Sequence, residues 1–285
     1  MKIGISLNPY DLRSLARYGN KKFEIIKNLG FSAVDYGTAN TETELYTLSE
    51  AELERKILSE KADANLAGIE ISQVHGPWRY PPRDLTEIDR AERLEKMKKS
   101  IVMTRLLGCK YWVVHPLMPY GTGDLLSGKA EETWKINLEF MPKLVEFAKT
   151  QGVTVCLENM PMHDFSISHP KEILKFVNTV NDDNFKICLD TGHIAVFQDL
   201  SIGDVVREFG DMMKVMHVHD NLGDGDRHLW PTRGRLDWHE FSRALKDIYF
   251  DGVFSLETAP SGTLDDESYL RECAELFEIT KKIIG

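Results

Sequence analysis

The sequence of 285 residues predicts a single (β/α)₈ TIM barrel that spans residues 1–285. Eight short runs of apolar and β-branched residues alternate with longer segments of helical period. The length suits one barrel, and no Pro-, Gly- or Ser-rich linker divides the chain. An open doubly wound sheet would alternate in the same way, but the number of strand–helix units and the length favour the closed barrel.

The expected strands are short apolar runs followed by polar residues. In chain order they cover 2–8, 33–37, 70–77, 111–117, 154–160, 185–191, 214–220 and 252–258. Helical periodicity fills the segments between them, at 12–29, 49–67, 86–107, 129–150, from about 170, 203–209, 238–248 and 265–284. Ser49 and Glu52 are spaced as a capping box at a helix start, and glycines such as Gly108 and Gly152 mark helix ends.

Composition restricts the classes of function. The chain is 42% hydrophobic and 28% charged, as in globular proteins, and its net charge of −10 disfavours binding to nucleic acid or anionic membranes. No apolar run approaches the ~18 residues of a membrane span, and Asn8-Pro9 interrupts any signal-peptide core. The four cysteines lack close pairing, which favours buried thiols over a disulfide or a thiolate site. We expect a cytoplasmic protein; its oligomeric state, including a homo-oligomer, stays open.

Six consecutive expected strands end in imidazole or carboxylate side chains. These residues are His75, His115, Glu158, Asp190 with His193, His217 with His219, and Glu257. A single buried His or a single helix-capping carboxylate would be ordinary. In a barrel, however, all these strand ends meet at one mouth, where unpaired carboxylates would repel one another unless a divalent cation lay between them. Nitrogen and oxygen ligands without thiolate suit Zn²⁺, Mn²⁺, Co²⁺ or Fe²⁺ better than Ca²⁺ or Mg²⁺.

The loop after the seventh expected strand carries Asp226-Arg227-His228. On an extended loop this spacing puts the carboxylate and the imidazole on one face, where they can hold a metal or a substrate; a plain surface turn is the alternative. Trp78 and Trp230 also lie near strand or loop ends and can form a stacking wall for a sugar or base. Core packing is favoured for Trp238, which begins a helix.

Four motifs resemble the xylose isomerase-like TIM-barrel superfamily of sugar isomerases and epimerases, inosose-type enzymes and endonuclease IV-type enzymes. They are Leu157-Glu158-Asn159, Leu189-Asp190-Thr-Gly-His193, His217-Val-His-Asp220-Asn221 and Gly234-Arg-Leu-Asp237-Trp238. The resemblance implies a core metal held by Glu158, Asp190, His217 and Glu257. It also implies that the two glutamates act as acid and base, and that His219 supports the ligands or faces the substrate. The candidate substrate-binding residues are His193, His219, Arg227 and Trp78.

The endonuclease-like branch would add metals held by His75 and His115, and by His193, Asp226 and His228. One departure concerns the substrate: the arginine that ketohexose epimerases carry after the seventh strand is replaced by Gly223, although Arg227, Arg233 and Arg235 follow.

Three functions follow in order of preference. The first is a divalent-metal-dependent isomerase or epimerase that acts on a small sugar or polyol through an enediolate. The second is a multinuclear-metal phosphoesterase of the endonuclease IV type, and the third is a sugar-binding barrel without catalysis.

Overall fold

The structure is a computed structural model that describes residues 1–38, 40–79 and 81–285. Over these residues, eight parallel strands form one sheet in the order β7-β6-β5-β4-β3-β2-β1-β8. The strands are β1 (Lys2–Leu7), β2 (Ala33–Gly37), β3 (Glu70–His75), β4 (Tyr111–Val114), β5 (Thr154–Glu158), β6 (Phe185–Asp190), β7 (Met213–His217) and β8 (Val253–Leu256).

The sheet closes on itself between β7 and β8. Val218, directly after β7, bridges to Leu256 in parallel. The Val218 amide donates to the carbonyl of Ser255 at 2.8 Å, and the Glu257 amide donates to the carbonyl of Val218 at 3.0 Å. The predicted single (β/α)₈ barrel is therefore confirmed, and the open doubly wound sheet is wrong.

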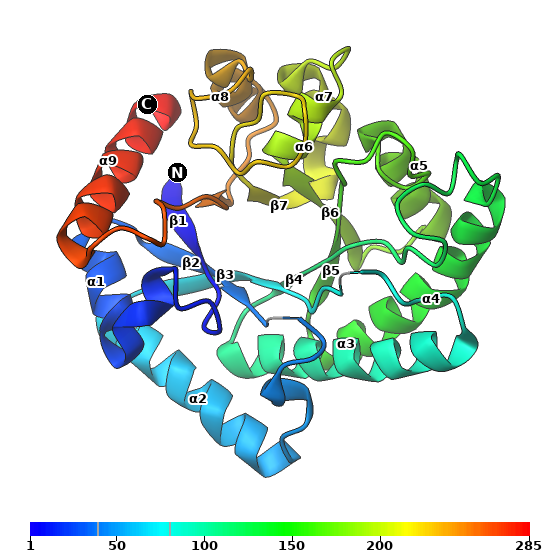
Figure 1. The fold of residues 1–285 in the computed structure, drawn as a ribbon, viewed down its shortest axis with the longest axis horizontal. Coiled ribbons are helices and arrows are strands. Elements are labelled where there is room, and N and C mark those ends of the chain that lie inside the picture. The colour runs from blue at the N-terminus through cyan, green and yellow to red at the C-terminus, as the bar shows by residue number, and fades with distance from the viewer. Residues whose placement is uncertain (39, 80) are drawn as a thin grey trace.

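Helices surround the barrel on its outside (Figure 1). They are α1 (Lys22–Asn28), α2 (Glu50–Ala67), α3 (Glu87–Leu107), α4 (Ala130–Gln151), α5 (Pro170–Val180), α6 (Thr191–Val196), α7 (Ile202–Phe209), α8 (Trp238–Asp247) and α9 (Asp266–Ile284), with 3₁₀ turns η1 (Leu15–Lys21), η2 (Glu44–Tyr46) and η3 (Gly210–Met212). The expected capping box is present, since the Ser49 side chain accepts from the Glu52 amide and Glu52 accepts from the Ser49 amide.

Two stretches differ from the sequence prediction. Residues 12–29 do not form one helix, because Gly19 adopts φ 53° and ψ −128°, a conformation that interrupts helical hydrogen bonding between η1 and α1. Residue 191 is not the end of a strand: β6 ends at Asp190, whose side chain accepts from the His193 amide and starts α6. Several other strands also end one to three residues earlier than expected, where their pairing with the neighbouring strand stops.

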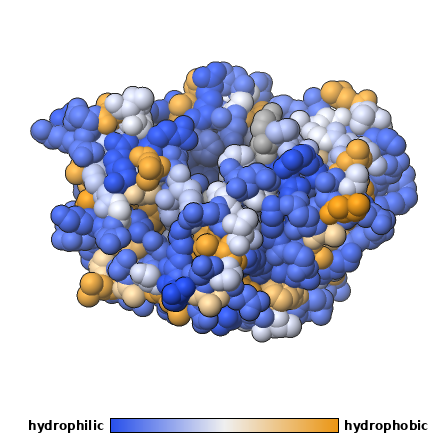
Figure 2. Space-filling view, turned by 60° about the horizontal axis from the view of Figure 1, so that its bottom comes forward, coloured by the Kyte–Doolittle hydropathy of each residue, from blue (hydrophilic) through white to orange (hydrophobic). Residues whose placement is uncertain are grey.

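Apolar side chains fill the space between barrel and helices. A smaller apolar layer inside the barrel consists of Val113, Cys156, Cys188 and Val215. All four cysteines are buried and free, as predicted. Among the described residues, no helix combines the length and apolar character needed to cross a membrane. The face in Figure 2 is mostly hydrophilic, with hydrophobic residues in scattered small groups.

Candidate metal centre

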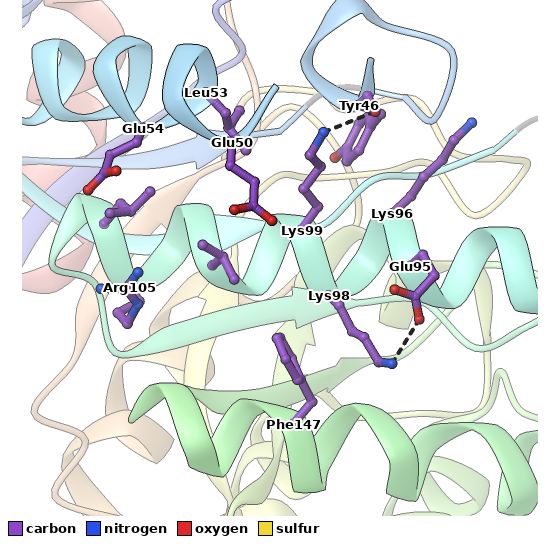
Figure 3. Close-up of a pocket in the computed structure, with 12 residues that line it drawn as sticks. Tyr46, Glu50, Leu53, Glu54, Glu95, Lys96, Lys98, Lys99, Arg105 and Phe147 are labelled. Carbon is purple, nitrogen blue, oxygen red and sulfur yellow. Dashed lines mark hydrogen bonds and ion pairs between the residues drawn. The ribbon is translucent and has the colours of Figure 1, made fainter. Parts of the chain in front are cut away.

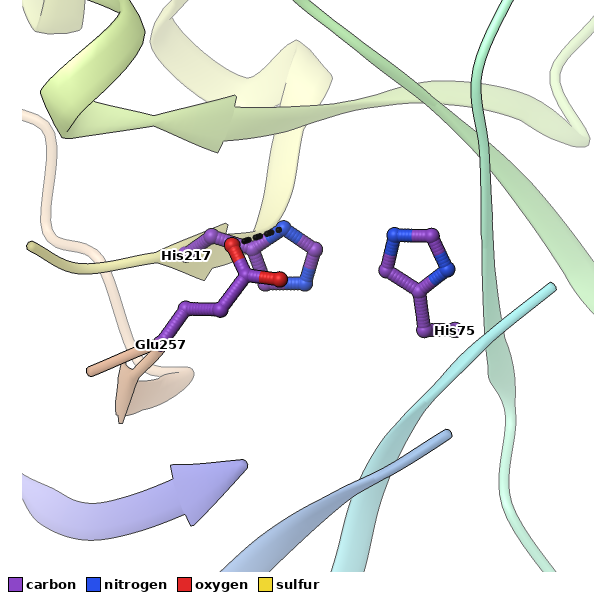
Figure 4. A group of neighbouring side chains, drawn as sticks. All are labelled: His75, His217 and Glu257. Carbon is purple, nitrogen blue, oxygen red and sulfur yellow. Dashed lines mark ion pairs between the residues drawn. The ribbon is translucent and has the colours of Figure 1, made fainter. Parts of the chain in front are cut away.

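His217, at the end of β7, lies at the centre of the strand-end cluster. Its Nδ1 is 2.9 Å from Glu158 Oε1 and 3.4 Å from Glu257 Oε2, while its Nε2 faces Asp35 Oδ2 at 2.8 Å. In Figure 4 the Glu257 carboxylate lies beside the His217 ring, and the His75 ring faces His217 from the other side. The ring is fully buried. One nitrogen therefore points to the two glutamates, and the other lies beside a buried carboxylate at ion-pair distance, although among the described residues it has no hydrogen-bond partner.

Two further histidines face the second oxygen of Glu158. His115 Nε2 lies 3.1 Å and His75 Nε2 lies 3.5 Å from Glu158 Oε2. The His75 ring stacks on His217, with centroids 5.3 Å apart and planes 9° from parallel. Over the described residues, Glu158 Oε2 is buried and accepts no hydrogen bond. A buried carboxylate oxygen that faces imidazole nitrogens without a hydrogen bond fits a bound divalent cation.

Asp190 both caps a helix and joins a ligand group. Its Oδ1 accepts from the His193 amide at 2.8 Å, and its Oδ2 lies 3.0 Å from His219 Nε2. Ligand atoms of Asp190, His193 and His219 all lie within 4.8 Å of one another. The Asp190 carboxylate is therefore both a helix cap and a candidate metal ligand.

Asp226 reaches the mouth of the barrel between three imidazoles. Its Oδ2 lies 3.5 Å from His193 Nε2 and 3.3 Å from His228 Nε2, and its Oδ1 lies 3.9 Å from His219 Nε2. The His228 ring stacks on His219 with centroids 4.1 Å apart. His228 adopts φ 48°, a conformation rare for a side-chain-bearing residue, and its carbonyl accepts from the Thr258 hydroxyl at 2.6 Å. Local strain of this kind is common at functional sites.

Arg227 lies apart from this group. Its guanidinium pairs with Asp224, and its side chain is 51% exposed. Trp78 lies at the rim of the mouth and is 43% exposed. Trp238 is buried and its indole N–H donates to Asp220 Oδ2 at 2.8 Å, which confirms core packing for that tryptophan.

The protein environment changes the proton affinity of the two glutamates in opposite directions. Burial raises the pKa of Glu257, although His217 and His228 act against the rise. Burial acts in the same sense on Glu158, but His217 and His115 outweigh it and hold the pKa of that carboxyl well below its usual range. Two carboxylates with different proton affinities in one site are typical of acid–base pairs.

The cluster opens into a cavity of about 390 Å³, a volume suited to a small molecule. The cavity is lined by His75, Trp78, Arg79, Pro82, His115, Met118, Thr122, Glu158, Met160, Pro161, Met162, His193, Asp226, His228 and Glu257. His219 is fully buried beneath this surface and supports Asp190 and His228 from behind.

A larger hollow of about 670 Å³ lies outside the barrel, among α2, α3 and α4 (Figure 3). Its basic side chains are engaged within the chain: Lys99 donates to the carbonyls of Tyr46 and Leu48, and Lys98 pairs with Glu95. The residues that line it include no histidine. The strand-end cavity is therefore the candidate site.

Sequence reasoning missed Asp35 and Gln73. Asp35 is a carboxylate inside β2, a strand whose residues are almost all buried, and that placement is a sequence signal of an internal polar contact. Gln73 donates to Asp35 Oδ2 at 3.3 Å and to the carbonyl of Met216 at 3.2 Å. Cys188 lies near Glu158 and His217. Burial raises the pKa of the Cys188 thiol, which fits the predicted buried thiol rather than a thiolate ligand.

The chain belongs to the family of xylose isomerase-like TIM barrels, whose family model matches residues 23–278. The chain is 28% identical over 204 residues to D-psicose 3-epimerase of Ruminiclostridium cellulolyticum, which covers 69% of this chain and 66% of that protein. It is 28% identical over 173 residues to inosose isomerase of Bacillus subtilis, and this match covers 58% of this chain and 60% of that protein. The chain thus spans less than two thirds of the length of these relatives.

Solved structures show the same fold over the whole chain. A D-psicose 3-epimerase from Clostridium cellulolyticum with D-tagatose superposes with a TM-score of 0.78 at 21% identity, covering 100% of this chain and 99% of that one. A D-tagatose 3-epimerase-like protein superposes with a TM-score of 0.74 at 25% identity, and the match covers 100% of this chain and 97% of that one.

Proposed function

We propose that this chain is a divalent-metal-dependent isomerase or epimerase of a small sugar or polyol. The observation that carries the proposal is the placement of Glu158 and Glu257, which both face Nδ1 of His217, at 2.9 and 3.4 Å, at the inner end of the cavity. The similarity to a psicose epimerase and an inosose isomerase supports this class of reaction.

Glu158, Asp190, His217 and Glu257 would hold the metal, and Zn²⁺ or Mn²⁺ suits these ligands best, with Co²⁺ and Fe²⁺ as further candidates. When bound, the cation supplies polarisation of a carbonyl and its neighbouring hydroxyl. The Asp35 carboxylate, 2.8 Å from Nε2 of His217, would act as a charge that favours the ring orientation in which Nδ1 faces the glutamates.

The two glutamates move the proton in this proposal. One carboxylate removes the proton from the carbon next to the substrate carbonyl, which leaves an enediolate, and the other carboxyl returns a proton. Return to the opposite face of the same carbon inverts it, and return to the neighbouring carbon isomerises the sugar. His193 and Trp78 line the same cavity and would contact the substrate, whereas the buried His219 would act by orienting Asp190.

Exchange of a substrate C–H proton with D₂O tests the proposal. Mn²⁺-loaded protein should exchange the proton in at least one member of a panel of ketoses, aldoses and inososes. Glu158→Gln and Glu257→Gln should each reduce the rate by about 10²- to 10⁴-fold. Glu95→Gln, on the outer face of α3, is the matched control and should keep the rate. A panel without any exchange would refute the proposal, and sugar binding with intact affinity in both active-site variants would favour the non-catalytic barrel.

A second function, a multinuclear-metal phosphoesterase, is favoured by one observation. His75 and His115 gather at Glu158, and Asp226 gathers with His193 and His228, so ligands for additional cations are close together. Two or three tightly bound Zn²⁺ per chain with cleavage of abasic-site DNA would support it. One exchangeable Mn²⁺ would count against it. The net charge of −10 works against a DNA substrate.

The cytoplasmic location stays a prediction. The oligomeric state is open and can be measured by sedimentation.

A further inference from the structure

Asn159 belongs to the motif Leu157-Glu158-Asn159, yet neither the proposed metal ligands nor the acid–base pair includes it. It directly follows Glu158, the last residue of β5, and is fully buried. The paired residues of β5 and β6 end at Glu158 and Cys188, so Asn159 lies beyond the part of the sheet where the two backbones pair. A buried amide without hydrogen bonds would destabilise the fold, and the partners of Asn159 therefore indicate its role.

The side chain of Asn159 clamps the backbone of Asp190 from both sides of one residue. Its Oδ1 accepts from the Asp190 amide at 2.9 Å, and its Nδ2 donates to the Asp190 carbonyl at 3.0 Å. The orientation of the amide follows from these partners, because an N–H group only donates and a carbonyl only accepts. On its other side Asp190 pairs with His217 of β7. The Asn159 amide thus takes the place of a neighbouring strand and ties the end of β5 to the start of α6.

The backbone carbonyl of Asn159 contacts the ring of His193. Its oxygen lies 2.6 Å from His193 Nδ1. Because a carbonyl oxygen only accepts, Nδ1 must carry the hydrogen, whether the ring is neutral or charged. Two carboxylate oxygens also face this nitrogen, Asp190 Oδ1 at 3.6 Å and Glu158 Oε1 at 3.9 Å, but both lie beyond hydrogen-bond distance.

The other nitrogen of His193 is left for the cavity. The ring lines the cavity, and its Nε2 lies 3.5 Å from Asp226 Oδ2. In the neutral ring Nε2 has the free lone pair, so it can accept from a hydroxyl group or bind a cation. Nδ1 can do neither while it donates to Asn159. His193 is thereby separated from Glu158 and Asp190, although Nδ1 is the nitrogen that lies near their oxygens.

We propose that Asn159 is a positioning residue, which keeps the hydrogen of His193 on Nδ1 and makes Nε2 the atom that His193 presents to a ligand. That this ligand is a sugar hydroxyl rests on the proposed function. The two parts of Asn159 act together, because Asp190 is the N-cap of α6 and His193 lies in that helix. The side-chain clamp on Asp190 therefore sets the distance between the Asn159 carbonyl and the His193 ring.

Asn159→Ala removes the clamp, and Asn137→Ala is the matched control. Asn137 is a buried residue of α4 that clamps Leu117 in the same way: it accepts from the Leu117 amide at 2.8 Å and donates to the Leu117 carbonyl at 3.0 Å. Its remaining bond goes to the carbonyl of Thr133, not to an imidazole. Both variants should lose stability in urea unfolding, but only Asn159→Ala should affect His193.

Nitrogen-15 NMR of the Zn²⁺-loaded full chain, labelled at histidine, measures which nitrogen carries the hydrogen. The His193 signals are those that disappear in His193→Gln. In wild type we expect the hydrogen on Nδ1 and slow exchange of this N–H with water. In Asn159→Ala the exchange should be about tenfold faster or more, because two hydrogen bonds that hold the carbonyl are lost. Asn137→Ala should keep the wild-type rate.

A second measurement follows the reaction. In Asn159→Ala, kcat/KM for proton exchange with the Mn²⁺-loaded protein should fall by about 10- to 100-fold, as is typical when a residue that orients an active-site histidine is removed. Asn159→Asp keeps the acceptor for the Asp190 amide and loses the donor to its carbonyl. It should therefore give an N–H exchange rate between those of wild type and Asn159→Ala, and it replaces the alanine variant if that variant does not fold.

A hydrogen on Nε2 instead of Nδ1 in the wild-type spectrum would overturn the inference, and this result needs no variant. A wild-type rate of N–H exchange in both Asn159 variants would overturn it as well, as would an equal acceleration in Asn137→Ala. Failure of the proposed function gives a different result, the absence of proton exchange with every sugar. The NMR measurement involves no substrate and then still decides whether Asn159 positions His193.

Discussion

Gly192 is the position where the smallest change should disturb the site most clearly. It lies in α6, between Asp190 and His193, and the His219 ring packs directly against its Cα. A Cβ atom added there would lie 2.0 Å from His219 Cε1 and 2.1 Å from its Nδ1, which is far inside van der Waals contact. We therefore expect Gly192→Ala to displace the His219 ring.

The ring has little freedom to move away. Its Nε2 contacts Asp190 at 3.0 Å, its face stacks on His228, and its backbone amide and carbonyl both bond to the Thr191 hydroxyl, at 3.0 and 2.7 Å. Overpacking of this kind costs about 1–3 kcal/mol. Alanine gains up to about 1 kcal/mol over glycine from helix propensity. Because an approach of 2.0 Å is severe, the upper part of the overpacking range applies, about 2–3 kcal/mol, and the net expectation is a loss of about 1–2 kcal/mol in the free energy of unfolding.

Metal binding should weaken as well, because His219 orients Asp190. Loss of such a supporting contact typically lowers metal affinity by about 10- to 100-fold. Urea unfolding of the metal-free chain measures the stability, and competition with a chromophoric chelator measures the affinity for Mn²⁺ or Zn²⁺. Both changes should appear in the same variant.

Gly123→Ala is the matched control, since its nearest neighbour would be Leu126 Cδ1 at 3.9 Å, an ordinary contact. It should change stability by less than about 0.5 kcal/mol. If the clash with the ring is the cause, Gly192→Ala should cost nothing in a His219→Ala background. The reasoning is refuted if Gly192→Ala matches Gly123→Ala in both measurements.

Three further predictions concern other parts of the molecule. Asp35→Asn, nearly equal in shape, should weaken metal binding about 10- to 100-fold, because the contact that orients His217 loses its charge; unchanged affinity in the chelator assay would contradict this. Burial holds the pKa of His169 below its usual value, and its Nδ1 accepts from the Lys171 amide at the start of α5. The folded state therefore binds fewer protons than the unfolded chain. Stability is lost as pH falls below about 6.5, the ordinary pKa of histidine. Relative to His169→Asn, a cap that does not titrate, wild type should therefore lose unfolding free energy between pH 8 and pH 5, and an identical stability difference between the two proteins at both pH values would count against it. Mn²⁺ at 100 times its Kd should stabilise the chain by about 2.7 kcal/mol in thermal unfolding, and EDTA should reverse the effect; an unshifted midpoint would mean that the folded chain does not bind the metal.

The barrel could be predicted from the sequence because its signals are local. Apolar runs and helical periods are readable within a window of a dozen residues, and so are the capping box at Ser49 and the glycine stops. The two element boundaries that were predicted wrongly also have local causes. The interruption at Gly19 and the short helix that Asp190 starts depend on single residues whose backbone conformation periodicity does not reveal.

The set of residues at the mouth was also readable from the sequence alone, because parallel strands of a barrel all end at the same face. Tertiary structure decided how these residues are used. Asp35 and His217 lie on β2 and β7, far apart in the sequence, so only the closed barrel shows which nitrogen of His217 faces the glutamates. Likewise, the cavity is lined in part by the loops after β3, β4 and β5, which approach one another only after folding. Within the loop after β5, the Ser168 hydroxyl bonds to the Met160 carbonyl and to the Met162 amide, contacts that no sequence pattern records.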